Sequence, residues 1–172
     1  MIRSARIADV PQIHSLITMY AERGLMLFRT PTELYEQVRS FVVCEKDGRI
    51  VGCCSLEILW KDMAEIRSLA VDPTAQGAGI GSQLVQALME EARRLGVPQV
   101  MSLTYRQSFF ERLGFKVVSK KALPHKVWTD CIRCPKQACC DEIPMLFEFV
   151  PGAVQAARPV AEPAAINNSG QE

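Results

Sequence analysis

The sequence lacks an apolar run of the ~20 residues that a membrane-spanning helix needs. Its longest wholly apolar stretches are only a few residues long. The segment at the start of the chain contains the acidic Asp9 and has no extended apolar core, which is unlike an export signal. We therefore expect no membrane partner and a cytoplasmic location.

The sequence also has no large excess of positive or negative residues. Twenty Lys and Arg residues oppose nineteen Asp and Glu residues, which leaves a formal net charge of +1. Nucleic acids and anionic membranes favour proteins with a broad basic surface, and this composition does not provide one. The charge balance therefore favours a small-molecule substrate and no nucleic-acid partner.

The chain is long enough to form one domain without covalent staples. A protein of this size buries about 70% of its unfolded surface, so the seven cysteines are not needed to hold the fold together. Residues 151–172 have three prolines and six alanines but no aromatic residue and no leucine. This segment cannot bury enough apolar surface to offset its ordering entropy. We predict a single domain over residues 1–150 and a disordered tail over 151–172.

Strand and helix patterns alternate along the domain. Asp9 is placed to cap a helix with Pro11 in its first turn, and Thr30 and Glu33 form a capping box. Asp47-Gly48 is a strong hairpin signal between two strands. We expect strands over 2–5, 41–45, 50–59, 64–71, 100–104 and 115–118, and helices from Val10, over 31–39, 79–95 and 108–113. This order predicts an α/β fold with a mixed antiparallel and parallel central sheet flanked by helices.

A glycine-rich turn joins the strand ending at Val71 to the long helix that begins near Gly79. Unpaired N–H groups at the start of that helix, together with its dipole, favour an anion such as phosphate. The segment has neither the Lys-Ser/Thr of a P-loop nor Gly-x-Gly-x-x-Gly spacing. By itself, a glycine-rich turn is therefore weak evidence for any particular ligand.

Two segments together resemble the GCN5-related N-acetyltransferase (GNAT) family. One is the Gln-x-x-Gly-x-Gly run starting at Gln76, and the other is Ser-Phe-Phe-Glu-Arg-Leu-Gly-Phe over 108–115. The resemblance implies the acetyltransferase fold and acetyl-CoA as donor. Its pantetheine would pair with Leu69, Ala70 and Val71, and its pyrophosphate would lie at Gln76, Gly77, Ala78, Gly79, Ile80, Gly81 and Ser82.

A narrower resemblance is to the short N-acetylglutamate synthases of bacterial arginine biosynthesis. It rests on the segments 27–31, 64–71 and 123–135, the last containing Pro-His-Lys-Val-Trp-Thr-Asp-Cys-Ile-Arg-Cys-Pro, and on Cys-Asp-Glu at 140–142. It implies acetylation of the α-amine of L-glutamate, the first step of that pathway. Another acceptor, such as glutamine, an amino-sugar or a protein N-terminus, stays open, as does a non-catalytic acyl-CoA or zinc sensor.

Acetyl transfer to an amine needs a base, a donor to the thioester oxygen and an acid. We assign the base to Glu65, whose alternative is a solvated strand residue or an ion pair with Arg67. The resemblance gives the oxygen contact to backbone N–H groups at Leu69 and Ala70. Phe110 stands where many family members have tyrosine, so Tyr105 is the candidate acid, with Thr104 or solvent as alternatives.

Glutamate carries two carboxylates, so its site should offer cations. The candidates are Arg29, Arg67 and Lys126, each of which could instead be an ordinary surface charge. Cys131, Cys134, Cys139 and Cys140, with His125, have the residue types of a zinc site. They lack the usual second pair of spaced ligands, so we assign no metal ligands, and zinc, a redox pair or buried thiols stay open. The sequence as a whole leaves open whether the protein forms a homodimer.

Overall fold

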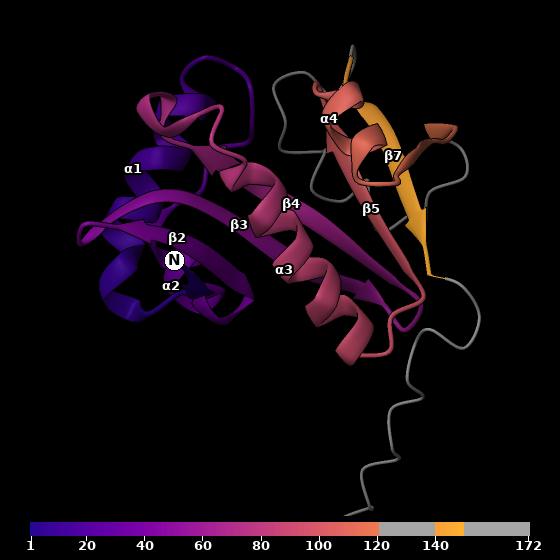
Figure 1. Ribbon diagram of the computed structural model, residues 1–172, viewed down its shortest axis with the longest axis horizontal. Helices are drawn as coiled ribbons and strands as arrows, with labels where there is room; N and C mark the ends of the chain where they lie inside the picture. Colours follow the sequence, from indigo (N-terminus) through magenta and orange to yellow (C-terminus); the bar gives the residue numbers. More distant parts are fainter. Residues whose placement is uncertain (121–139, 150–172) are drawn as a thin grey trace, which may run out of the picture.

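A seven-stranded sheet forms the centre of the protein, whose computed structural model describes residues 1–120 and 140–149. The strand order is β1-β2-β3-β4-β5-β7-β6 (Figure 1). Strands β4 and β5 are parallel, and every other neighbouring pair is antiparallel, which confirms the predicted mixed sheet. The strands are β1 (Ile2–Ser4), β2 (Phe41–Lys46), β3 (Arg49–Trp60), β4 (Met63–Val71), β5 (Gln99–Thr104), β6 (Lys116–Val117) and β7 (Ile143–Glu148).

Helices cover both faces of the sheet. They are α1 (Val10–Ala21), α2 (Pro31–Glu36), α3 (Ile80–Arg94) and α4 (Gln107–Arg112), and 3-10 turns occur at η1 (Ile7–Asp9), η2 (Val38–Ser40) and η3 (Pro73–Ala75). The neighbouring cysteines of β3 show the alternation of a strand buried on both sides. Cys53 packs in the cluster under α1, and Cys54 packs in the cluster under α3. Within the described ranges, no helix is long and apolar enough to span a bilayer.

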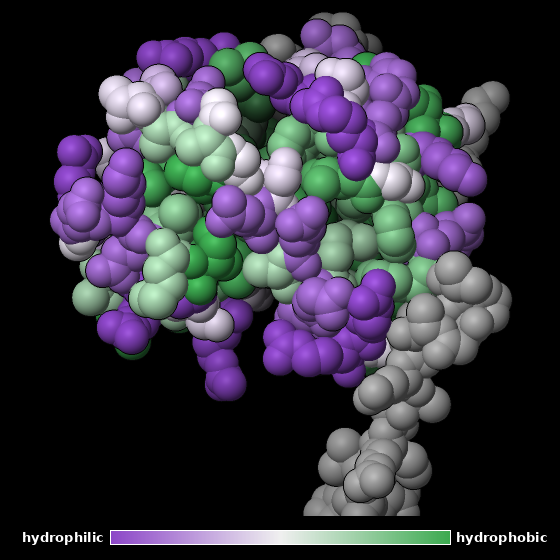
Figure 2. Space-filling view, viewed as in Figure 1, coloured by the Kyte–Doolittle hydropathy of each residue, from purple (hydrophilic) through white to green (hydrophobic). Residues whose placement is uncertain are grey.

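Helix α3 presents its apolar stripe to the sheet. Leu84, Val85, Leu88 and Ala92 are buried along it, and Gly96 follows the helix in the left-handed conformation. The C-terminal end of α3 is hydrophilic in the space-filling view (Figure 2). There, ion pairs join Arg93 to Glu90 and Arg94 to Glu91. The helix is therefore fixed by its buried face, which sets the position of its N-terminus against the sheet.

The buried cysteines of the hairpin are core residues. Cys44, Cys53 and Cys54 are buried and have no disulfide. Burial raises the pKa of the Cys53 thiol to about 12 and that of Cys54 well above its ordinary value, because the thiolate would lose its hydration. These thiols stay protonated and pack as small apolar groups.

The structure corrects two details near the N-terminus. The Asp9 carboxylate does not cap α1, because it accepts hydrogen bonds from both terminal nitrogens of Arg3, at 2.7 and 2.9 Å, and from the Arg6 N–H. The Thr30–Glu33 capping box is confirmed, but α2 ends at Glu36 rather than at residue 39. The 3-10 turn η2 follows, and it leads directly into β2 at Phe41.

Strand β7 was not predicted, and it changes the far edge of the sheet. It pairs with β5 along its whole length and with β6 on its other side. The short β6, expected over 115–118, contains only Lys116 and Val117 and does not contact β5 in the ladder. The alternating apolar residues Ile143, Met145, Phe147 and Phe149 carried a usable signal, since they all join one core cluster.

Candidate active site

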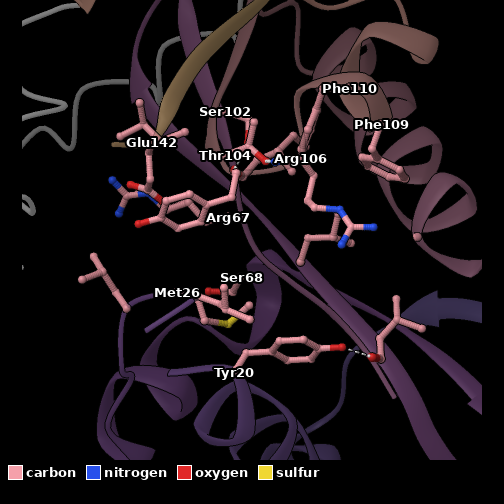
Figure 3. Close-up of a pocket in the computed structure, with 18 of the residues that line it drawn as sticks. Tyr20, Met26, Arg67, Ser68, Ser102, Thr104, Arg106, Phe109, Phe110 and Glu142 are labelled. Carbon is pink, nitrogen blue, oxygen red and sulfur yellow. Dashed lines mark hydrogen bonds between the residues drawn. The ribbon is translucent and has the colours of Figure 1, made fainter. Parts of the chain in front are cut away.

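A cleft of about 920 Å³ opens where β4 and β5 separate (Figure 3). The two strands pair only between residues 63–65 and 99–101, although β4 continues to Val71. Beyond that point β5 keeps its partner β7 but has no ladder to β4. The remaining β4 backbone therefore faces the cleft instead of a neighbouring strand, which provides peptide groups for an extended ligand.

A β-bulge interrupts β4 on the wall of this cleft. Cys53 pairs with Ala70 and Ser55 pairs with Arg67, so Ser68 and Leu69 together face the single residue Cys54. Ser68 has a φ of 52°, a left-handed conformation that costs a non-glycine residue energy. Such bulges redirect the backbone near active sites. This one lies at Leu69, the position to which the family resemblance assigned contact with the thioester oxygen.

The N-terminus of α3 forms the second wall. Gly77 and Gly79 have φ values of 83° and 75°, and no side chain caps the helix. The first N–H groups of a helix have no partner within it, and the dipole places partial positive charge there. All the glycine-rich residues predicted to bind pyrophosphate line the cleft except Ala78: Gln76, Gly77, Gly79, Ile80, Gly81 and Ser82. The arrangement suits a phosphate group.

Tyr20 joins these two walls, a role that its place on the apolar stripe of α1 did not indicate. Its hydroxyl donates a hydrogen bond to the carbonyl oxygen of Val71 at 2.5 Å (Figure 3) and accepts one from the Gln76 side-chain amide at 2.7 Å. Leu69 and Val71 line the cleft, whereas Ala70 is buried in the core under α1. The hydrogen bonds therefore fix the glycine-rich turn against the end of β4.

A chain of alternating charges occupies the opposite end of the cleft. The Arg67 guanidinium donates from Nε to Glu65 at 2.5 Å and from Nη1 to Glu57 at 2.8 Å. Arg29, from the loop between α1 and α2, pairs with the other oxygen of Glu57. The structure thus brings together Glu65, Arg67 and Arg29, which were predicted separately. It also adds Glu57, which the sequence analysis did not single out.

Glu65 is almost fully buried yet lines the cleft, with 3% of its surface exposed. A carboxylate in such a place needs compensation, which Arg67 provides. The ion pair with Arg67, which was the alternative to a role as base, is present. The carboxylate lies on the cleft wall, which is where the proposed base would have to be.

Tyr105 and Phe110 lie on the β5 and α4 side of the cleft. The Phe110 ring packs edge-on against Phe109 and Phe115 and is buried, so no hydroxyl is present where the family often has one. The Thr104 hydroxyl accepts the Arg106 N–H at 2.9 Å, which supports the turn after β5. Thr104 and Tyr105 both line the cleft, so both stay candidate acids.

Some predicted site residues lie outside the described part of the chain. These are Lys126, His125, Cys131, Cys134 and Cys139. Cys140 is described and lines the cleft with Glu142. Among residues 1–120 and 140–149, no group of three His, Cys, Asp or Glu side chains is arranged to hold a metal ion.

Comparison with known proteins gives consistent matches. A model of the acetyltransferase (GNAT) family matches residues 10–115. The chain is 39% identical to an uncharacterized N-acetyltransferase of Chlorobaculum tepidum, over 84% of this chain and 94% of that protein. It is 38% identical to the amino-acid acetyltransferase of Mycobacterium tuberculosis, over 77% and 78%.

A solved structure is similar over most of the chain. The N-acetylglutamate synthase of Neisseria gonorrhoeae, complexed with coenzyme A and N-acetyl-glutamate, superposes with a TM-score of 0.79 at 28% identity. The match covers 87% of this chain but only 35% of the synthase, so this chain corresponds to one part of that larger protein.

Proposed function

This chain belongs to the acetyltransferase (GNAT) family, and on that premise we propose that it transfers the acetyl group of acetyl-CoA to the α-amine of L-glutamate. The reaction would supply the first step of arginine biosynthesis in the cytoplasm. The single observation that supports the proposal is one cleft with the uncapped N-terminus of α3 at one side and the guanidinium groups of Arg29 and Arg67 at the other.

The donor would lie along the separated strands. Its pyrophosphate fits the N–H groups of Gly77 to Ser82, and its pantetheine fits the backbone of β4 from Leu69 to Val71. The cleft volume is within the range of small-molecule sites. Tyr20 and Gln76 would keep these two contact regions in register with one another.

The acceptor would bind at the charged end. Arg29 and Arg67 line the cleft and present guanidinium groups, which bind carboxylates with two parallel hydrogen bonds. Lys126, in the Pro-His-Lys segment, is proposed as a third cation. An α-amine held beside Arg67 would meet Glu65, which lies on the same strand as Leu69.

In the proposed reaction, the amine nitrogen attacks the thioester carbonyl directly. Glu65 takes the amine proton, either directly or through a water molecule, and backbone N–H groups at Leu69 and Ala70 stabilise the developing oxyanion. The carbon–sulfur bond then breaks, and Tyr105 or solvent gives a proton to the CoA thiolate. No covalent enzyme intermediate is required.

The acceptor is tested by incubating the protein with acetyl-CoA and each of the twenty amino acids. Released CoA is measured with a thiol reagent after the protein is removed, because the seven cysteines would also react. Release with glutamate well above glutamine is expected. Release with a different amine would refute glutamate as the acceptor, and retention of acetyl-CoA without turnover would favour a sensor.

A further inference from the structure

Glu57 contacts both guanidinium groups of the charged end without itself lining the cleft. Its two carboxylate oxygens accept from Arg29 and from Arg67, whereas both arginines and Glu65 lie on the cleft wall. The contact is therefore made from the neighbouring strand β3, beside the cleft wall. A residue in this place acts on a ligand through the groups that it holds.

The sheet register explains why this arrangement is stable. Glu57 on β3 lies directly opposite Glu65 on β4, so two carboxylates share one face of adjacent strands. Like charges at such positions repel. Arg67, two residues beyond Glu65, bonds to both carboxylates and offsets that repulsion. Arg29 adds a second positive charge, so two guanidinium groups pair with the two carboxylates.

Arg29 depends on this contact for its position. It lies in the loop between α1 and α2, where neighbouring Leu25, Leu27 and Phe28 are exposed. The side chains of Arg29 and Glu57 are only 13% and 15% exposed, so this pair is largely shielded from water. Breaking a shielded pair leaves an uncompensated charge, which favours movement of the longer, loop-borne side chain.

We propose that Glu57 is a positioning residue for acceptor recognition, which orients Arg29 and Arg67 toward the carboxylates of the amino-acid substrate. This inference rests on the proposed function for the identity of the acceptor. It adds that acceptor affinity depends on a carboxylate the acceptor does not touch. Donor binding, at the other end of the cleft, does not depend on Glu57.

The test compares Glu57→Gln with Glu45→Gln. The control removes the same charge from a second sheet carboxylate, which pairs with Arg3 at 2.7 Å and does not line the cleft. Glu57→Gln is expected to raise the KM for glutamate at least tenfold and to change the KM for acetyl-CoA less than twofold. In hydrogen-exchange mass spectrometry, amides of residues 24–30 should exchange faster in Glu57→Gln only. Glu57→Asp, which keeps the charge but shortens the reach, replaces the variant if Glu57→Gln does not fold.

A double variant shows whether Glu57 acts through Arg29. If it does, the double variant Arg29→Gln with Glu57→Gln raises the KM for glutamate by less than the product of the two single effects, because coupled residues are not additive, and the part that remains reports the contact of Glu57 with Arg67. Unchanged exchange over 24–30 overturns the inference, whatever the acceptor is. Faster exchange in a protein that does not use glutamate supports Glu57 as the positioning residue while the proposed acceptor fails. Faster exchange with an unchanged KM for glutamate overturns the link to recognition.

Discussion

The hydroxyl of Tyr20, on α1, donates a hydrogen bond to the carbonyl oxygen of Val71, the last residue of β4. The same hydroxyl accepts from Gln76 in the glycine-rich turn. Tyr20 thereby connects a helix on one face of the sheet to both regions proposed to hold the donor. A residue outside the two family motifs thus helps to hold the proposed donor site in place.

Tyr20→Phe should weaken acetyl-CoA binding. A neutral hydrogen bond contributes about 1 kcal/mol, so the loss predicts a KM for acetyl-CoA raised by roughly fivefold, with the KM for the acceptor unchanged. Steady-state kinetics with each substrate varied would measure both. Tyr35→Phe is the matched control, because Tyr35 is exposed on α2 and does not line the cleft. Equal effects of the two variants would contradict the role of Tyr20.

Gly79→Ala should impair both stability and donor binding. Its φ of 75° is costly for alanine, by roughly 1–2 kcal/mol, and N–H groups at this turn are proposed to hold the pyrophosphate. Gly48→Ala is matched in strain, with a φ of 73° in the β2–β3 hairpin, and a Cβ there meets no neighbouring atom. Both variants should lower the melting temperature, but only Gly79→Ala should raise the KM for acetyl-CoA. A normal KM in Gly79→Ala would argue against a phosphate site at α3.

Glu65→Gln should remove turnover while leaving acetyl-CoA bound. General-base catalysis typically contributes 10²- to 10⁴-fold, so kcat is expected to fall by about that range. Isothermal titration with acetyl-CoA should give the same affinity as the original protein. Glu45→Gln, at a residue that does not line the cleft, should keep full kcat. Retained activity in Glu65→Gln would remove Glu65 from the chemistry and leave it as the partner of Arg67.

The Arg3–Asp9 pair predicts a specific acid sensitivity. The Arg3 guanidinium, bonded to both carboxylate oxygens, holds the pKa of Asp9 below its ordinary value despite burial. A lowered folded-state pKa contributes stability that is complete above the unfolded value, near 4, and is lost as the pH falls through the folded value. Asp9→Asn should therefore cost about 1–3 kcal/mol of unfolding free energy at neutral pH and progressively less below about pH 4. Urea denaturation from pH 7 to pH 3 would test this, and a constant difference would contradict it.

Turns and helix starts that have a short sequence motif were predicted correctly. The Asp47-Gly48 turn has φ values of 51° and 73°, as a type I′ hairpin requires, and the Thr30–Glu33 box begins α2. The predicted function of Asp9 as a cap was wrong, because a distant partner, Arg3, takes the carboxylate. Helix propensity and residue spacing cannot show that a side chain elsewhere in the fold will bind the capping group instead.

The site was predictable where one segment carries the chemistry. The glycine-rich turn and Glu65 lie within continuous motifs, and the cleft contains them. Glu57 and Tyr20 were not predicted as site residues, because their contacts cross 28 and 51 positions of the chain and depend on strand register. A carboxylate on a strand and a tyrosine on a helix stripe have ordinary alternatives until the partners are placed.

The most direct test of the account is the ratio of kcat/KM for L-glutamate to that for L-glutamine, with the acetylated product identified by mass spectrometry. Arg29 and Arg67 provide two guanidinium groups for a substrate with two carboxylates, so the account predicts N-acetylglutamate as product and a ratio above about ten, which corresponds to ~1.4 kcal/mol. Acetylation of glutamine or another amine at a higher kcat/KM than glutamate would contradict it.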